Sequence, residues 1–415
     1  MVEDVAFAQP QKRQAAVVFV LITLAIDALG IGLVIPIVPR LVEQLTGRPP
    51  STAVLAVGPL VACFALAQLM AAPILGALSD RYGRRPIILG SVAGIGLNYL
   101  LLAWAPTLIW LYVGRLIAGA TSANFSSASA YIADVSTPAE RARRFGLIGA
   151  TFSFGFVVGP AMGGVLGDIS LRLPFLVAAG LAALNVLYGW FVLPESLPQS
   201  RRQPFVWRGA NPVNSIRTLM ADPVLSKLAL AWSGLWFGLN TLQATFVLSN
   251  GERFGWTGTQ NGIALGLVGI TGAVVQGLLV RRAISRLGER RTAVFGFCIS
   301  ACSYVIVAFA DVGWLIYVGI VVQAFGGLAN PSVRALVSAR AGPERQGRAM
   351  GAMSVVEGLT SITAPLFAAG LFWAFSGPGH PHFPGAPFLV GTFVYLLAAM
   401  AVHSVPASAL IRAEH

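Results

Sequence analysis

The chain has 415 residues, of which 56% are hydrophobic and 11% are charged. Because soluble domains carry about 25% charged residues, this composition excludes an ordinary soluble protein and indicates one that lies in a membrane. The formal net charge of +12 would suggest a nucleic-acid partner for a soluble protein. Membrane topology explains the positions of the basic residues better, and we expect no nucleic-acid partner.

Long apolar stretches recur along the whole chain, most of them close to the roughly 20 residues that a membrane-spanning helix needs. Residues 1–13 are polar and are not followed by a cleavage-site pattern, so we interpret the first stretch as a permanent span and not as a signal peptide. In chain order, we predict twelve spans at residues 15–38, 53–78, 86–104, 107–133, 144–166, 172–193, 225–248, 260–281, 292–310, 313–337, 347–375 and 387–404.

A polar connection between the sixth and seventh spans divides the chain. It covers residues 194–224 and contains Arg201-Arg202. We therefore predict an all-α membrane protein with two six-helix halves, residues 1–193 and 225–415, joined by a cytoplasmic linker.

The distribution of lysine and arginine predicts the orientation. With the N-terminus inside, most of the 28 basic residues fall on cytoplasmic segments, and Arg115 falls within the fourth span. The four that fall outside are Arg40, Arg48, Arg172 and Arg253. The positive-inside rule therefore predicts that both termini are cytoplasmic.

A basic segment between the second and third spans, Gly76-Ala-Leu-Ser-Asp-Arg-Tyr-Gly-Arg-Arg-Pro86, carries the most detailed motif. Its glycines permit a tight turn, and its aspartate lies near several arginines. A plain positive loop is the alternative, but such a loop does not require this arrangement. Residues 281–291 repeat the pattern weakly after the eighth span. The candidate gate residues are Gly76, Asp80, Arg81, Gly83, Arg84 and Arg85.

The Gly76–Pro86 segment resembles motif A of the major facilitator superfamily. Gly114-Arg-Leu-Ile-Ala-Gly119 resembles its motif B. Gly155-Phe-Val-Val-Gly-Pro-Ala-Met-Gly-Gly164 resembles its motif C, the antiporter motif of span five. The marked residues of that motif are Gly155, Gly159, Pro160, Gly163 and Gly164. The resemblance implies the transporter fold in which two parallel six-span halves enclose a site near the midplane.

A closer resemblance, to the bacterial tetracycline/proton efflux proteins, covers nearly the whole chain. It includes Ala25–Pro36, Ala130–Asp134, Glu140–Arg143 and Glu344–Gly347. It implies a drug:proton antiporter of the bacterial inner membrane. It also implies a cytoplasmic gate latch, in which Asp134 joins the motif A arginines and Asp80 pairs across to neighbouring helix ends.

Three ionisable residues inside spans are candidates for proton coupling: Asp27, Glu357 and Arg115. A charge near the bilayer centre costs about 2.5–3.5 kcal/mol on insertion scales, so such a group usually faces a cavity or a partner. For Asp27, a hydrogen bond to a neighbouring helix is the alternative, and the resemblance implies a role in transport. For Glu357 we hypothesise a second protonation site, with a solvent-facing acid near a helix end as the alternative. Arg115 either holds Asp27 or fixes helix packing, and the resemblance links it to proton transfer.

Polar and aromatic residues on other spans are candidates for the substrate cavity. They are Gln68, Asn98, Asn124, Phe125, Trp236, Asn240 and Gln243. Interhelical hydrogen bonds and ordinary packing are the alternatives. The glycines of motif C, at spacings of four, allow close helix approach, so we expect span five to seal one face of the cavity. Helix packing without a sealing role is the alternative, because it depends on the same close approach.

Several residues depart from the tetracycline carriers. Asn98, Gly272 and Ser300 stand where those carriers have an acid, a histidine and an aspartate, and Arg334 stands where a glutamine is usual. Fewer ligands are then left for a divalent metal–drug complex. A substrate other than tetracycline, neutral or anionic, is therefore an alternative.

Enzyme motifs are missing from the sequence, including HExxH, paired CxxC, GxSxG and GxxxxGK[ST]. We expect no catalytic residues, no cofactor and no metal site, and we assign Cys63, Cys298 and Cys302 to packing. We predict a monomeric, proton-coupled exporter that works by alternating access, whose partners are a small-molecule drug, protons and the lipid bilayer. The alternatives are a same-fold importer or metabolite carrier and a non-transporting receptor.

Overall fold

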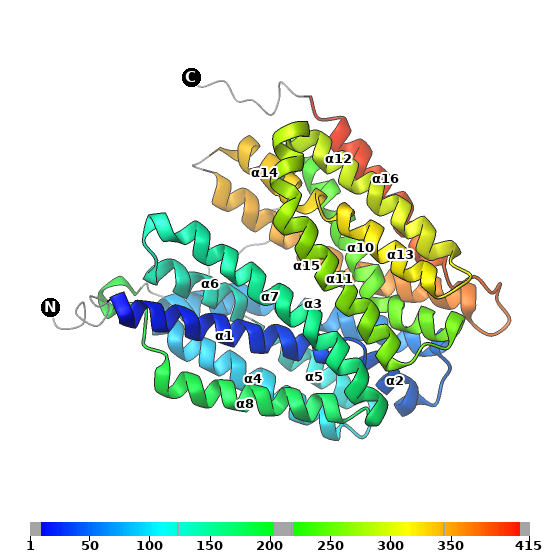
Figure 1. The fold of residues 1–415 in the computed structure, drawn as a ribbon, viewed down its shortest axis with the longest axis horizontal. Helices are drawn as coiled ribbons and strands as arrows, with labels where there is room; N and C mark the ends of the chain where they lie inside the picture. The colour runs from blue at the N-terminus through cyan, green and yellow to red at the C-terminus, as the bar shows by residue number, and fades with distance from the viewer. Residues whose placement is uncertain (1–9, 123, 203–216, 218, 343–344, 407–415) are drawn as a thin grey trace. The chain divides into compact units, whose positions relative to one another are not determined.

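The computed structural model describes residues 10–122, 124–202, 217, 219–342 and 345–406. Each regular element in this part of the chain is a helix (Figure 1). The helices are α1 (Pro10–Val34), α2 (Val38–Thr46), α3 (Pro50–Tyr82), α4 (Arg84–Trp104), α5 (Leu108–Ala120), α6 (Asn124–Val135), α7 (Pro138–Ile169), α8 (Leu173–Val192), the short 3-10 helix η2 (Gln199–Arg201), α10 (Pro223–Phe254), α11 (Gly258–Leu278), α12 (Val280–Phe309), α13 (Trp314–Gly326), α14 (Ala329–Ala341), α15 (Gln346–Ser376) and α16 (Ala386–His403).

Length and composition make this an all-α, multi-pass membrane protein. Within the described residues, ten helical stretches are long and apolar enough to cross a membrane, and α5 is a shorter apolar helix. The predicted twelve spans are consistent with this finding, although the count itself stays a prediction.

The predicted fourth span, residues 107–133, is wrong as one continuous helix, because α5 ends at Ala120 and α6 begins at Asn124. The hydroxyl of Thr121 donates to the carbonyl of Ile117 at 2.8 Å, and that of Ser122 donates to Gly119 at 2.7 Å. Such side chains compete with the backbone for helix carbonyls, which favours a break at this point.

The predicted tenth span, residues 313–337, is also two helices. Helix α13 ends at Gly326, and α14 begins at Ala329. Pro331 supplies no backbone N–H to the helical ladder and crowds the preceding turn. The amide of Gly327 donates to Ala324 at 3.1 Å, so the chain tightens there before α14 starts.

The helices pack as two compact units. The first comprises Met1–Leu41, Cys63–Ala210 and Gly258–Gly266, and the second comprises Val42–Ala62, Asn211–Thr257 and Leu267–His415. The division into residues 1–193, a linker and 225–415 stays a prediction of the sequence. Linker residues 203–216 and 218 lie outside the described part.

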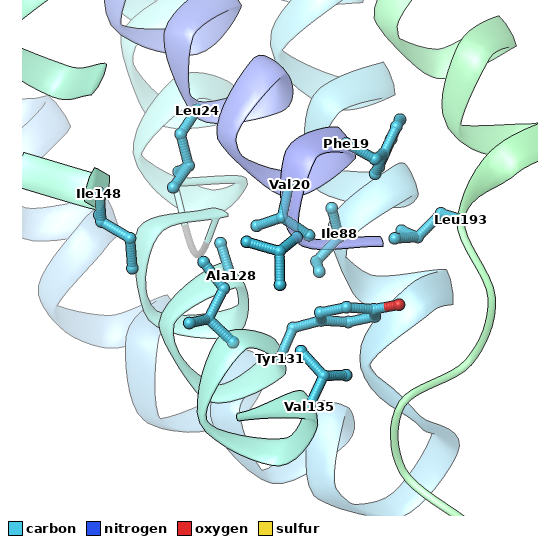
Figure 2. Packing of buried hydrophobic residues seen from close by; sticks show 11 residues of the cluster. Phe19, Val20, Leu24, Ile88, Ala128, Tyr131, Val135, Ile148 and Leu193 are labelled. Carbon is cyan, nitrogen blue, oxygen red and sulfur yellow. The ribbon is translucent and has the colours of Figure 1, made fainter. Parts of the chain in front are cut away.

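Tyr131 is the largest buried side chain in the core at one end of the first unit. Its ring is fully buried among apolar residues of α1, α4, α6 and α7, which converge in Figure 2. The Tyr131 hydroxyl donates to the carbonyl of Pro194 at 2.9 Å. This bond ties α6 to the chain that leaves α8, and so places the next residue, Glu195, beside the motif A segment.

The second unit has an aromatic core between α10, α12 and α16. The Tyr304 and Tyr395 rings meet edge to face with centroids 5.0 Å apart, and the Tyr304 hydroxyl donates to the carbonyl of Gly238 at 2.6 Å. A Cβ on Gly238 would overlap the Tyr395 hydroxyl, so a glycine is needed for this approach.

Candidate functional site

The motif A segment is almost entirely helical. Residues 76–82 form the last turns of α3, α4 begins at Arg84, and Gly83 alone makes the turn. Gly83 has φ 108° and ψ 163°, a region that favours glycine. Gly288 in the weak repeat has φ 75° and ψ 163°, so the same kind of break occurs inside α12. This shared backbone supports the internal repeat.

Glu195 caps the first turn of α4. Its carboxylate accepts hydrogen bonds from the amides of Arg84 at 2.8 Å and Arg85 at 3.2 Å. It also accepts from the amides of Ser196 and Leu197 at 3.0 and 3.1 Å. The first amides of a helix lack partners within the helix and favour a negative group, so Glu195 satisfies this helix end.

Gly83 leaves room for that carboxylate. A Cβ at this position would lie 2.6 Å from the Glu195 carboxyl carbon and would overlap one carboxylate oxygen. The second glycine of the motif therefore serves both a turn and a cap. Gly76 differs, because a Cβ there would meet no atom within 4 Å.

Arg84 connects the predicted gate residues. Its guanidinium pairs with Asp80 at 2.6 Å and with Asp134 at 3.3 Å, and donates to the Ser79 hydroxyl at 3.1 Å. Asp134 also accepts from the Ser196 hydroxyl at 3.2 Å. The ion pair of Asp80 is therefore local, and Arg84 carries the connection to α6.

The other two arginines of the motif differ in their contacts. Arg85 donates to the carbonyl of Trp190 at 2.6 Å, so it anchors the end of α8. Arg81 is exposed, and its guanidinium carbon lies 5.1 Å from the centroid of the Tyr82 ring.

Asp27, Arg115 and Tyr99 form a second cluster in this unit. Asp27 on α1 is buried, and Arg115 on α5 is partly buried. The buried phenol of Tyr99 on α4 interacts electrostatically with both of these charges. Gly30, one turn after Asp27, makes room for the Tyr99 phenol, because a Cβ at position 30 would lie 2.9 Å from the Tyr99 hydroxyl. Tyr99 was not among the sequence candidates, since one tyrosine in an apolar helix gives no signal.

The glycines of motif C pack α7 directly on α1, and the two helices run alongside one another in Figure 1. A Cβ on Gly155 would lie 2.7 Å from the Leu29 amide nitrogen, and one on Gly159 would lie 2.7 Å from the Leu29 carbonyl oxygen. A Cβ on Gly163 would overlap the Leu33 carbonyl. Close helix approach, as the spacing predicted, is the arrangement at all three positions.

Pro160 and Gly164 use neighbouring faces of α7. The Pro160 ring packs against α1, where a Cβ on Gly32 would lie 2.7 Å from the ring Cδ. A Cβ on Gly164 would overlap the carbonyl of Gly258 at the start of α11. Helix α7 therefore approaches both α1 and the first turns of α11 through small residues.

Asp168, near the end of α7, caps α11. Its carboxylate accepts from the amides of Gly258 at 3.0 Å and Thr259 at 2.8 Å, and from the Thr259 hydroxyl at 2.6 Å. Arg40 of α2 forms an ion pair with it at 2.6 Å. No local pattern indicates this cluster, because its three segments lie far apart in the chain.

In the second unit, Glu357 on α15 lies near Trp232 of α10 and Arg334 of α14. Both side chains interact electrostatically with its carboxyl, and the contact with the Trp232 indole N–H falls short of full hydrogen-bond geometry. The guanidinium carbon of Arg334 lies 5.0 Å from the centroid of the Trp232 ring. Glu357 is partly buried, so it belongs to a defined cluster of side chains.

Two of the predicted cavity residues meet in the same unit. The Asn240 amide donates to the Trp236 carbonyl at 2.7 Å and to the Ser361 hydroxyl of α15 at 3.0 Å. The Trp236 ring lies 6.3 Å from that of Trp232, with an edge-on geometry. Asn240 therefore makes an interhelical hydrogen bond, which was the alternative to a role in the substrate cavity.

The remaining predicted cavity residues are not brought into one cluster. Gln68 on α3 and Gln243 on α10 are exposed, and Asn98 on α4 is buried. The side chains of Asn124 and Phe125 lie outside the described part of the structure.

The two units carry the signatures of a known family throughout. A family model described as the Major Facilitator Superfamily matches residues 20–284 and 244–411. The chain belongs to the Major Facilitator Superfamily. Its described helices, the motif A turn and the glycine packing of motif C are therefore those of a membrane transporter.

Relatives within the superfamily are similar over nearly their whole lengths. The tetracycline resistance protein of class C from Escherichia coli is 37% identical over 391 residues, which covers 94% of this chain and 97% of that protein. The class G protein from Vibrio anguillarum is 34% identical over 396 residues, which covers 93% of this chain and 96% of that protein. The crystal structure of the human organic anion transporter MFSD10 (TETRAN) matches with a TM-score of 0.71 and 25% identity, over 95% of this chain and all of that one.

The departures from the tetracycline carriers have distinct surroundings. The Oδ1 atom of Asn98 is buried without a hydrogen-bond partner. Ser300 is buried against Gly326, where an added Cβ would lie 3.2 Å from the serine Cβ. Gly272 faces open space. A Cβ would therefore meet no atom at position 272, whereas Ser300 lies in close contact with the backbone of α13. Within the described residues, no cluster of three His, Cys, Asp or Glu side chains could hold a metal ion.

Proposed function

We propose that this transporter exports a small amphipathic, tetracycline-like drug across the bacterial inner membrane in exchange for protons. Two relatives that are 37% and 34% identical over nearly the whole chain are tetracycline resistance proteins, which supports drug efflux. The observation that carries proton coupling is the buried Asp27 carboxyl, which shares Tyr99 with the Arg115 guanidinium.

The Asp27 cluster can couple proton binding to conformation through charge. While Asp27 is ionised, its negative charge and the positive charge of Arg115 act on Tyr99 in opposite directions. Protonation removes the negative charge and leaves that of Arg115, which favours a rearrangement that gives the arginine another partner. A proton drives transport only if its affinity differs between the inward- and outward-facing states, so the proposal requires the surroundings of the Asp27 carboxyl to differ between the two states. Tyr99, which interacts with both charges, would position the two groups.

The motif residues would act in alternating access. Close packing of α7 on α1 through Gly155, Gly159 and Gly163 would seal one face, because no side chain separates the backbones. At the predicted cytoplasmic side, the Asp80–Arg84–Asp134 network would act as the latch. Asp80→Ala would then slow turnover while the protein still inserts in the membrane.

Proteoliposomes under an imposed pH gradient test the proposal. We expect tetracycline to move against its gradient at the expense of the pH gradient, and to stimulate proton flux. Asp27→Asn should abolish both flows. The matched acid-to-amide control is Asp311→Asn, at an exposed position between α12 and α13, and it should leave both unchanged.

The outcomes separate the competing hypotheses. Coupled transport that persists in Asp27→Asn would refute its role as the proton carrier. Uptake without proton exchange would favour an importer, and no gradient-dependent movement of any compound would favour a receptor. Glu357→Gln tests the second protonation site, which is refuted if proton-driven transport is unchanged.

A second candidate function is export of a compound other than tetracycline. It is favoured by the three positions that differ from the tetracycline carriers, because Asn98, Gly272 and Ser300 supply neither a charge nor an imidazole to bind a metal–drug complex. The similarity to a human organic anion transporter points in the same direction. Transport of an organic anion but not of tetracycline in the same proteoliposomes would support this candidate.

A further inference from the structure

Arg334 is a cation inside a candidate membrane span whose charge is not paired. It lies on α14, within the apolar stretch Trp314–Ala341, and its side chain is exposed. Within the described part of the chain its guanidinium has no hydrogen-bond or ion-pair partner, and its contact is the face of the Trp232 ring.

This arrangement does not suit a purely structural arginine. A guanidinium offers five N–H donors, and none of them is used here. Arg334 lies three residues before the predicted end of its span at residue 337, where a long side chain can reach water. The exposure of Arg334 therefore indicates a water-accessible surface, where its free donors can meet a ligand.

The surroundings of Arg334 define the shape of that ligand. Trp232 is almost completely buried, so it is a rigid platform beneath the guanidinium. The Trp236 ring meets it edge-on at 6.3 Å, which extends the aromatic surface. Glu357 is the acidic group whose charge reaches Arg334, yet it lies beyond ion-pairing distance. The donor fork thus remains available, and the neighbouring ring that is partly exposed is that of Trp236.

We infer that Arg334, held on Trp232, is the recognition point for an organic anion with an aromatic ring system. A carboxylate matches the planar donor fork in a bidentate manner, and the flat ring of such a substrate packs against Trp236, which is partly exposed. This inference rests on the proposed export function and names the substrate class of the second unit. A glutamine at this position would offer neither the charge nor the fork.

A matched pair of probes tests the inference by equilibrium binding. We choose 1-naphthoate and 1-naphthamide, which share a ring system and differ in charge, and measure their affinities by calorimetry on the full chain in nanodiscs. The wild type should bind the anion at least tenfold more tightly than the amide. Arg334→Gln should reduce this ratio to about one while the amide affinity stays unchanged, which also shows that the variant is folded.

Two further variants make the result specific. Arg334→Lys keeps the charge but loses the fork, so its ratio should fall between those of the wild type and Arg334→Gln. Arg348→Gln is the control, an exposed arginine in the first turn of α15, and it should keep the wild-type ratio. A wild type without preference for the anion, or an unchanged ratio in Arg334→Gln, would overturn the inference.

The test separates this inference from the proposed function, because binding is measured without a gradient. If the anion preference depends on Arg334 but no drug is exported under a pH gradient, only the export function fails. If tetracycline is exported while Arg334 makes no difference to anion binding, only the present inference fails.

Discussion

The Asp168 cap on α11 can be broken by one conservative change, Asp168→Asn. The wild-type carboxylate serves four donors: two backbone amides, one hydroxyl and the guanidinium of Arg40. Asparagine has the same shape but keeps one acceptor oxygen and has no charge. It cannot retain the ion pair, and its NH2 group would face donors in place of an acceptor.

The expected cost follows from these contacts. Hydrogen bonds to a charged group contribute about 1.5–3 kcal/mol each, and the partial exposure of this pair places the loss near the lower end. We therefore expect local opening of the first turn of α11 to become easier by about 2 kcal/mol. At about 1.4 kcal/mol for each factor of ten, that change is roughly a 30-fold faster exchange of the capped amides.

Amide hydrogen exchange measures this effect directly. On the intact protein in nanodiscs, the amides of Gly258 and Thr259 should lose protection in Asp168→Asn, whereas those in the middle of α11 should not. Asp222→Asn is a reciprocal control, because Asp222 caps α10 through the amides of Val224 and Leu225 at 2.8 and 3.3 Å. That variant should affect its own helix and leave α11 unchanged.

Two results would refute this reasoning. A change of less than about threefold at residues 258–259 would mean that water replaces the carboxylate at little cost. An equal loss of protection throughout α11 would mean that the substitution destabilises the whole helix and does not open a cap.

Further predictions concern glycines and pH. Gly83→Ala should lower the melting temperature strongly, because a Cβ would clash with the Glu195 carboxyl and the backbone has a positive φ; Gly180→Ala, at an open helical position, should leave it unchanged or raise it. Gly159→Ala should slow transport and also lower the melting temperature, since its Cβ would meet the backbone of α1 and force α7 away from it. Burial alone would raise the pKa of Asp222, but hydrogen bonds from Arg340 and two amides outweigh it and lower the pKa. The ionised carboxylate therefore contributes its full stabilisation above the pKa of about 3.9 that it has in the unfolded chain, and this contribution is lost as the pH falls through the lower pKa of the folded state. The melting temperatures of the wild type and Asp222→Asn should accordingly converge as the pH falls below about 4.

The sequence was sufficient for the features that depend on local chemistry. Apolar stretches of spanning length identify membrane helices, because the bilayer leaves backbone groups no partner outside the helix. Gly83 and Gly288 could be recognised as breaks because a short basic segment with glycine must turn at the membrane surface. Asp27 and Glu357 could be identified because an acidic side chain within an apolar span costs free energy and therefore indicates a functional site.

Continuity of the spans could be judged only in part. Hydropathy sums over a window, so residues 107–133 and 313–337 gave single spans although each is two helices. The breaks depend on local hydrogen bonding by Thr121 and Ser122, and on Pro331, whose effects a hydropathy sum does not register. These side chains stand in the sequence, but their competition with the helix ladder shows only in the structure.

Tertiary structure alone decided which groups meet. Glu195 caps a helix 111 residues before it, and Asp168 caps one 90 residues after it. Tyr99 joins Asp27 and Arg115 from a third helix, and Trp232 supports Arg334 from a distant one. The local pattern singles out Asp27 and Arg115 as charges within spans but does not indicate their partners, because the partner of each residue is determined by helix packing. The sequence therefore determined the membrane helices, their turns and the intramembrane charges, while three-dimensional packing determined the partner of each charge.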